Sequence, residues 1–233
     1  MSLNPSSGNM YNWGNIATWN PLGGECLHGC SYCYVKKGRL KTVKKYQGKI
    51  TLVEKELKTN LYKCKKLNPP FTIFVCSCND LFAEKVPFDY IQKILNTCWN
   101  HQKNTYLFQS KNPGRFSDFY LNFPPKTILG TTIESNRNYN NTKAPSPAER
   151  AEKLSLFGEF KRMISIEPIM DFDLEEFISL IKKASPDFVS IGADSKNSHL
   201  EEPSPQKIKI FIKKIKPITK VKLKSNLKRV AET

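Results

Sequence analysis

The sequence predicts an α/β fold, in which a parallel sheet curves into a partial or nearly closed parallel (β/α)6-7 barrel. Short, almost wholly apolar segments recur along the chain, as expected for strands that are buried on both faces. Amphipathic segments with helix-start signals lie between them. Because strand and helix alternate six or seven times, right-handed crossovers that build a parallel sheet are favoured.

The first half of the chain supplies three of these units. Strands are expected near residues 15–19, 71–76 and 105–109. Thr51-Leu52-Val53-Glu54 has the form of a capping box, and apolar positions as far as Leu67 extend the helix that it opens. Pro87 is expected in the first turn of the next helix, because proline is tolerated there. A shorter helix is expected over residues 113–120.

The second half continues the alternation. Strands are expected at 127–133, 163–166, 188–191 and 220–224. The helices between them are expected to begin at Ser146-Pro147-Ala148-Glu149, at Asp173 and at Ser204. Ser135 to Pro145 contains four Asn and no large aliphatic residue. That segment is expected to be a mobile loop over the site or a plain disordered connector.

Length and composition predict a single domain over residues 1–233. Residues 1–24 form a lead-in without charged side chains that carries the aromatic residues Tyr11, Trp13 and Trp19, and residues 206–233 form a basic C-terminal segment. The first residues have no basic region followed by an apolar core, and no apolar run approaches the roughly 18 residues that span a bilayer. We therefore expect a cytoplasmic monomer that makes no use of a membrane.

The formal charge of +16 is concentrated in two blocks. Seven Lys or Arg residues and no acid lie between Tyr34 and Val53, and ten lie between Gln206 and Val230, again without an acid. Blocks of this kind favour nucleic acid as a partner. The alternative is a solvated face in a chain whose composition is rich in Lys, Asn and Ile.

Three cysteines at CxxxCxxC spacing, Cys26, Cys30 and Cys33, lie in a short loop that opens with two glycines. Thiolates at this spacing can bind three irons of a 4Fe-4S cluster and leave the fourth iron without a protein ligand. A structural zinc site that adds His28 or a distant cysteine is the alternative, and simple buried thiols are another. A disulfide framework is disfavoured by seven cysteines without a secretory signal.

Polar residues follow the expected strands at their carboxyl ends. Alternation along each strand places the following on shared faces: Cys76, Cys78 and Asp80; Thr132 and Glu134; Ser165 and Glu167; Ser190, Gly192 and Asp194. The opposite faces are apolar and should pack under helices. Since α/β barrels place their chemistry at this rim, the four acids are candidate ligand contacts. They could instead cap the turns that follow the strands.

The cysteine spacing, with Tyr32 just before Cys33, resembles the signature of the radical S-adenosylmethionine (SAM) superfamily. That resemblance implies a barrel of radical SAM type and SAM bound to the open iron through its amino and carboxylate groups. It also implies reductive cleavage to a 5′-deoxyadenosyl radical, with an external electron donor such as flavodoxin or ferredoxin. The backbone near Tyr32 would contact the adenine.

Further motifs resemble a phage-associated, largely uncharacterised radical SAM family from about Trp19 to Asn226. They are Trp19-Asn20-Pro21, Asp80-Leu81-Phe82, Lys111-Asn112-Pro113, Ser165-Ile166-Glu167-Pro168 and Ile191-Gly192-Ala193-Asp194. The chain departs from that family at Ala193-Asp194, where Gly-Glu is expected, and in the cysteine spacing, which is often longer there. These departures affect the substrate side rather than the cluster.

A more distant similarity is to the spore photoproduct lyases, radical SAM enzymes that repair a thymine lesion in DNA. It implies that Cys76 or Cys78 donates hydrogen, that Asn79 or Asp80 holds the SAM amine and that Lys111 pairs with the SAM carboxylate. For both cysteines, packing in a tight strand is the alternative. The full set of predicted cofactor-binding residues is Tyr32, Ser77, Asn79, Asp80, Lys111, Thr132, Glu134, Ser135, Glu167 and Asp194.

Three functions therefore compete. The first is a radical SAM enzyme that modifies or repairs a nucleic acid, DNA or tRNA. The second is a radical SAM enzyme that acts on a peptide or small metabolite, and the lack of further cysteine clusters near the C-terminus argues against a peptide-modifying enzyme with auxiliary clusters. The third is a metal-stabilised nucleic-acid-binding protein without catalysis.

Overall fold

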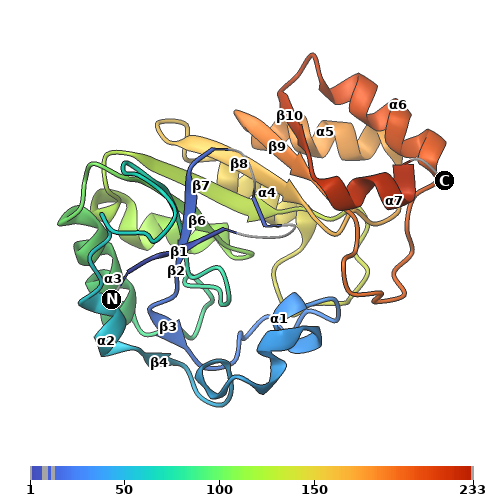
Figure 1. The fold of residues 1–233 in the computed structure, drawn as a ribbon. Coiled ribbons are helices and arrows are strands. Elements are labelled where there is room, and N and C mark those ends of the chain that lie inside the picture. The colour runs from blue at the N-terminus through green and yellow to red at the C-terminus, as the bar shows by residue number, and fades with distance from the viewer. Residues whose placement is uncertain (1, 7–9, 12–13, 232–233) are drawn as a thin grey trace.

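The computed structural model describes residues 2–6, 10–11 and 14–231. Its main sheet has eight strands in the order β1-β2-β5-β6-β7-β8-β9-β10 (Figure 1). Their bounds are β1 Asn4–Pro5, β2 Ile16–Trp19, β5 Thr72–Val75, β6 Thr105–Gln109, β7 Thr127–Thr132, β8 Lys161–Ile166, β9 Phe188–Ile191 and β10 Lys220–Leu223. The two-residue β1 is antiparallel to β2, and the other neighbouring pairs are parallel. Since β1 and β10 are the two edges of the sheet, the barrel is open, as the sequence predicts.

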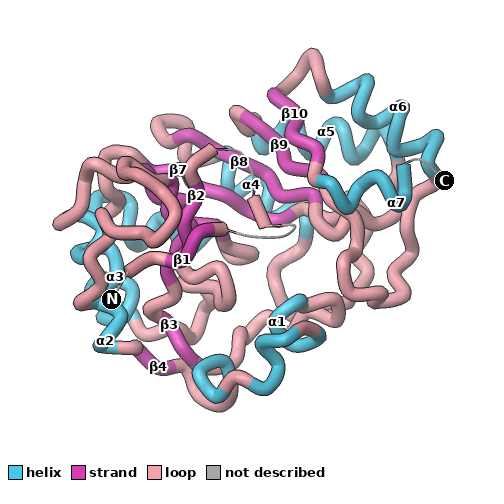
Figure 2. Tube along the Cα trace, in the orientation of Figure 1, coloured by secondary structure: helices cyan, strands magenta, loops and turns pink. Residues whose placement is uncertain are grey.

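Helices follow the parallel strands and cover one face of the sheet (Figures 1 and 2). The longer ones are α3 Phe88–Trp99, the 3-10 segment η3 Pro113–Asn122, α4 Pro147–Ser155, α5 Leu174–Ala184 and α6 Pro205–Ile215. Shorter turns are α1 Tyr34–Lys37, η1 Arg39–Thr42, η2 Lys44–Tyr46, α2 Glu54–Leu57, η4 Ser225–Leu227 and α7 Lys228–Ala231. No helix in the described ranges is both long and apolar enough to cross a bilayer.

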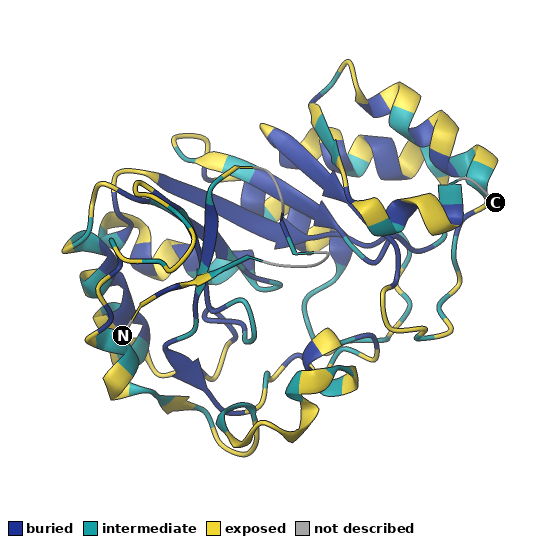
Figure 3. Cartoon of the chain, viewed as in Figure 1, coloured by how far each residue is buried: buried dark blue, intermediate teal, exposed yellow. Residues whose placement is uncertain are grey.

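Strand alternation divides the apolar residues between two faces. The residues predicted to pack under helices lie in the large core with the helix side chains: Val75, Ile133, Ile164, Ile166, Val189 and Ile191. A smaller cluster covers the inner face of the sheet and includes Tyr11, Phe74, Leu107, Met163 and Phe188. Figure 3 shows the strands buried and the outer sides of the helices exposed. Trp13, the other aromatic residue of the lead-in, lies outside the described residues.

Two of the predicted helix starts are confirmed by their capping bonds. The Ser146 side chain accepts from the Glu149 amide at 3.2 Å, and the Ser204 side chain accepts from the Lys207 amide at 3.3 Å. Asp173 occupies the N-cap position of α5, but its carboxylate binds Arg137 instead of capping the helix.

The long helix predicted from Thr51 to Leu67 is wrong. Thr51–Leu52 forms β4, which pairs with β3, Leu22–Gly23, just ahead of the cysteines. The helix that follows has only four residues, Glu54–Leu57. Because Thr51 is committed to the β-bridge, it cannot cap the helix, and the chain from residue 58 to 70 continues in turns and irregular structure.

Candidate functional site

A cavity of about 530 Å³ lies where the parallel strands end. One wall is the cysteine loop, and the other walls come from the segments at or after the ends of β5, β6, β7, β8, β9 and β10. The carboxyl ends of barrel strands are where such folds place their chemistry. Tyr11 and Phe74, whose ring centroids are 5.5 Å apart, also line the cavity and connect it to the smaller core.

Cys26, Cys30 and Cys33 all line this cavity as free thiols. Gly24, just before them, has φ +88°, and a Cβ there would lie 2.2 Å from the Lys49 carbonyl oxygen. Only glycine allows this close approach. Burial, together with the negative charge of Asp80, raises the pKa of Cys26 to about 12.

The donor set fits a 4Fe-4S cluster with one open iron. Three thiols face one cavity that retains room for a small molecule, and in such a cluster each thiolate binds a different iron. Within residues 2–6, 10–11 and 14–231, no three His, Cys, Asp or Glu side chains are arranged around a single ion. His28, the additional ligand in the zinc alternative, is held by Asp80.

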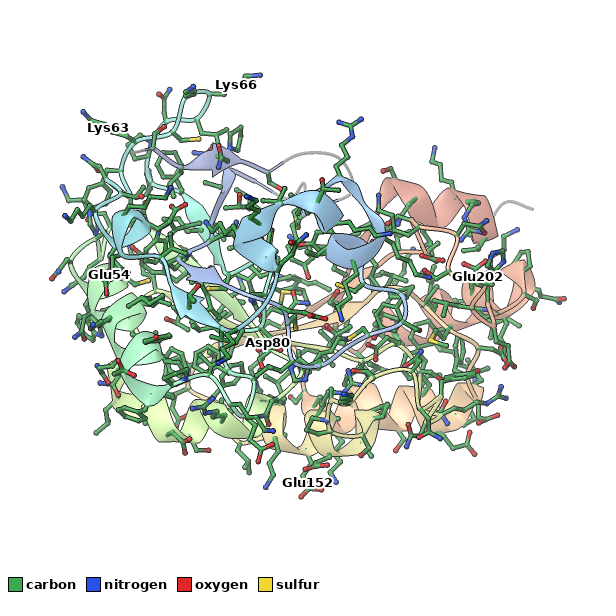
Figure 4. The ribbon with its side chains drawn as sticks, turned by 90° about the horizontal axis from the view of Figure 1, so that it is seen from below. Glu54, Lys63, Lys66, Asp80, Glu152 and Glu202 are labelled. Carbon is green, nitrogen blue, oxygen red and sulfur yellow. The ribbon has the colours of Figure 1, made fainter. Side chains whose placement is uncertain are left out.

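Asp80 is a buried junction between three segments (Figure 4, where it lies at the centre of the molecule). Its Oδ2 accepts from His28 Nε2 and from the Lys111 amide, both at 2.7 Å. Its Oδ1 accepts from Ser110 Oγ at 2.7 Å and from the Phe82 amide at 3.0 Å. Burial alone would raise the pKa of Asp80, but His28 and these hydrogen bonds hold it below its ordinary value. Both carboxylate oxygens therefore already have partners within the chain.

Glu134 is the second buried carboxylate at this rim. It forms ion pairs with Lys111 and with Arg150, whose Nη2 lies 2.9 Å from Glu134 Oε2, and it accepts from the Tyr32 hydroxyl. Burial opposes the charged form, yet the two cations outweigh it and hold the pKa of Glu134 well below its ordinary value. Tyr32 is thereby connected to α4, and Lys111, predicted to meet the SAM carboxylate, already has a carboxylate partner.

The opposite side of the cavity carries a second set of charged side chains. Lys224 is buried, pairs with Glu167 and lies 4.5 Å from the centre of the Tyr11 ring. Asn226 donates to Glu167 at 3.1 Å. Asp194 accepts from the backbone amides of Lys196 and Ser198, the turn-capping role that was the alternative for these acids.

The prediction that Cys76 and Cys78 share a strand face is wrong. β5 ends at Val75, and Cys76 adopts φ 55° in a turn that the Asn79 amide closes onto the Cys76 carbonyl at 3.0 Å. Cys76 is therefore buried in the large core, whereas Cys78 lines the cavity. Asn20 holds this turn, because its side-chain oxygen accepts from Ser77 Oγ at 3.1 Å and from the Cys78 amide at 3.0 Å.

The segment from Ser135 to Pro145, predicted as a mobile loop over the site or a disordered connector, instead supports the cysteine loop through backbone hydrogen bonds, and we call it the buttress segment. The Ser31 amide donates to the Asn141 carbonyl at 2.9 Å, and the Lys143 amide donates to the His28 carbonyl at 2.8 Å. Cys30 Sγ lies 3.3 Å from Thr142 Oγ1. The polar side chains that suggested disorder therefore belong to a segment whose backbone bonds to another loop.

Most of the predicted site residues meet at the cavity. Twelve of them line it: Cys26, Cys30, Tyr32, Cys33, Ser77, Cys78, Asn79, Asp80, Lys111, Thr132, Glu167 and Asp194. Glu134 reaches it through Tyr32 and Lys111, while Cys76 lies in the core and Ser135 bonds to the Asp171 carbonyl. Sequence reasoning missed the roles of Tyr11, Asn20, Arg150 and Lys224. A fully buried arginine on a helix has no local signal, but Asn20 lies in the Trp19-Asn20-Pro21 motif.

Comparison with known proteins identifies a matching protein family and solved structures with a similar fold. A family described as "Protein of unknown function (DUF5131)" matches residues 10–200. No curated protein sequence matches the chain. Because the family is described only in these words, the predicted phage association stays a prediction.

Solved structures with a similar fold include radical SAM enzymes. Spore photoproduct lyase, solved with AdoMet and a dinucleoside spore photoproduct bound, has a TM-score of 0.55 at 13% identity over 93% of this chain and 66% of its own. Streptococcus suis SuiB, bound to precursor peptide SuiA, has a TM-score of 0.59 at 10% identity over 90% of this chain and 48% of its own. The chain thus spans about half to two thirds of the length of these proteins, and at such identities the likeness establishes the fold alone.

Replacing Glu134 with Gln should lower the free energy of unfolding by about 3–5 kcal/mol, because the buried Arg150 and the half-buried Lys111 lose their counter-charge. Urea unfolding measures this. Glu152→Gln makes the same chemical change in an exposed pair with Lys183 and should have a much smaller effect on stability, because solvent screens that pair.

The pH dependence gives an independent check of the Glu134 pairing. The folded-state pKa of Glu134 lies below its ordinary value of 4.5, so its charge contributes stability above that pH and the contribution is lost as the pH falls. The stability difference between parent and Glu134→Gln should therefore shrink on acidification. A difference that stays constant, or equal losses for the Glu134 and Glu152 variants, would contradict this account.

Proposed function

Since the chain belongs to the DUF5131 family of unknown function, we propose from its site that it is a radical SAM enzyme acting on a nucleic acid. One observation carries the proposal. Three free cysteines at CxxxCxxC spacing face a single cavity at the carboxyl ends of a parallel, partly closed barrel. The fold likeness to spore photoproduct lyase and SuiB supports the same class.

In this proposal Cys26, Cys30 and Cys33 hold a 4Fe-4S cluster, and SAM occupies the adjoining cavity. When bound, the cluster would supply one electron, from an external donor such as flavodoxin or ferredoxin, that splits SAM into methionine and a hydrogen-abstracting 5′-deoxyadenosyl radical. Candidates for SAM contacts are Ser77, Asn79, Lys111, Thr132, Glu167 and Asp194, which line the cavity. Asp80, Glu134 and Tyr32 each bond to Lys111, Asp80 through the Lys111 amide and the other two through its ammonium group. These three residues would position the residues that contact SAM.

The nucleic-acid part of the proposal rests on the first basic block. Tyr34 and Val35 line the cavity, and the chain that continues from them carries Lys37, Arg39, Lys41, Lys44 and Lys49, all exposed. Within the described residues none of these five cations has a carboxylate partner. In the second block, Lys207, Lys214, Lys224 and Arg229 are paired with acids of this chain, but Lys209, Lys213 and Lys216 are exposed as well. What distinguishes the first block is that it continues directly from the cavity-lining Tyr34 and Val35. Unpaired charge beside the cavity is where phosphates would bind.

Cys30→Ala should abolish 5′-deoxyadenosine formation, because it removes an iron ligand. The test is anaerobic reconstitution with iron and sulfide, metal analysis, an ultraviolet-visible spectrum, and quantification of 5′-deoxyadenosine after reduction with dithionite. Cys64→Ala is the matched control: Cys64 is partly buried outside the cavity, so that variant should keep its cluster.

Two outcomes would overturn the cluster assignment. One is a Cys30→Ala protein that forms 5′-deoxyadenosine at the parent rate. The other is a parent protein that takes up zinc in place of iron and unfolds when Cys30 is replaced, which would favour the metal-stabilised binding protein.

Cys78 is the cysteine positioned to donate hydrogen to a substrate radical, since it lines the cavity and Cys76 does not. Transfer from its weak S–H bond would leave a thiyl radical at Cys78 Sγ. With a substrate identified, Cys78→Ala should keep SAM cleavage and divert the product to side products. Cys76→Ala should instead lower stability by about 1 kcal/mol with the product pattern unchanged. Product analysis that finds the parent pattern for Cys78→Ala would reject the donor role.

Reversing Lys37, Arg39 and Lys41 to Glu should weaken binding to DNA or tRNA. If all three contact duplex phosphates, the slope of log affinity against log salt should fall by up to about 3. The control reverses Lys209, Lys213 and Lys216, which are equally exposed on and beside α6 and change the net charge by the same amount. Fluorescence anisotropy over a salt series measures both. Equal losses for the two triples would indicate a response to net charge alone, and no loss in either would favour a peptide or metabolite substrate.

A further inference from the structure

The cysteine loop is attached to the barrel by two separate sets of side chains. Around Cys33, the Tyr32 hydroxyl donates to Glu134, the Tyr34 hydroxyl donates to the Ser77 carbonyl, and Cys33 itself is the N-cap residue of α1. Around Cys26 and Cys30, the side chain that points into the protein is His28, which is only 6% exposed. Its neighbours Leu27 and Gly29 are exposed.

His28 lies two residues from Cys26 and two residues from Cys30, at the centre of this half of the loop. Its Nε2 is 2.7 Å from Asp80 Oδ2, and both side chains are buried. Asp80 is fixed in turn by donors that follow β5 and β6: the Phe82 amide, Ser110 Oγ and the Lys111 amide. The carbonyl of His28 also accepts from the Lys143 amide, which belongs to the buttress segment 135–145.

We propose that His28 and Asp80 are positioning residues, a latch that fixes Cys26 and Cys30 over the carboxyl ends of β5 and β6. Asp80 then acts through His28, and its role differs from the amine contact expected from sequence. The geometry supports this because each Asp80 oxygen accepts two hydrogen bonds from within this chain. One of the donors is His28, which lies 52 residues away in sequence. The expected effect of the latch on the cluster rests on the proposed function, whereas the latch itself can be tested on the metal-free protein.

The test compares His28→Gln with His28→Asn. The Gln side chain can place an N–H donor near the position of Nε2, whereas the Asn side chain is too short to reach Asp80. On the metal-free full-length protein, hydrogen–deuterium exchange of peptides covering residues 25–31 should be about tenfold faster in His28→Asn, because a hydrogen bond to a charged group is lost. Exchange in His28→Gln should stay near the parent rate, and α3 serves as the unaffected internal reference.

After reconstitution, the electron paramagnetic resonance spectrum of the reduced cluster, recorded with and without SAM, gives the second readout. His28→Asn should alter the spectrum or its response to SAM, and His28→Gln should restore the parent behaviour. Identical exchange in all three proteins would overturn the latch, and so would a Gln variant that behaves like Asn or a loosening that extends equally to residues 32–37. A parent protein that binds no iron would refute the proposed function, while the exchange experiment would still decide on the latch.

Discussion

Carboxylates buried at the ends of parallel strands are the constraint on which this structure depends. Asp80 and Glu134 stay charged inside the protein only because each is surrounded by donors from several segments. A buried, unpaired carboxylate would cost several kcal/mol, so these partners must be in place whenever the chain is folded. Because the partners of these two carboxylates come from the cysteine loop, from the segments after β5 and β6, and from α4, the ion pairs and hydrogen bonds join these elements into one unit.

The two junctions divide the loop between them. Asp80 holds its first half through His28, and Glu134 holds its second half through Tyr32. Lys111 contacts both, since its amide donates to Asp80 and its ammonium group pairs with Glu134. A side-chain substitution at residue 111 would remove only the contact with Glu134, because the bond to Asp80 is made by the main-chain amide.

Local patterns in the sequence were sufficient to predict the seven parallel strands of the main sheet and several helix starts, but not β1, β3 or β4. Ser146 and Ser204 cap their helices as expected, and period-two alternation correctly assigned the apolar faces. The helix start predicted at Thr51 was wrong because a Thr-x-x-Glu pattern is compatible with a helix cap and with a short strand. Pairing of Thr51 with Gly23 in the β3–β4 pair makes it a strand. The predicted orientation of Cys76 was wrong because period-two alternation holds only within a strand, and β5 ends at Val75, before the turn that contains Cys76. Arg150 and His28 find their partners across the fold, which no local pattern specifies.

Two hydrogen bonds between the cysteine loop and the segment from Ser135 to Pro145 join main-chain atoms only, from Ser31 to Asn141 and from Lys143 to His28. Two more use the Thr142 hydroxyl, which contacts Cys30 Sγ and the His28 carbonyl. Main-chain bonds place no demand on side-chain identity at these positions. Related chains could therefore change residue 141, and residue 143 to anything but proline, and still make these two main-chain bonds, whereas the Thr142 hydroxyl contributes through its side chain. Sequence variability in this segment would then be compatible with strict geometric constraint, and conservation would be a poor guide to its importance.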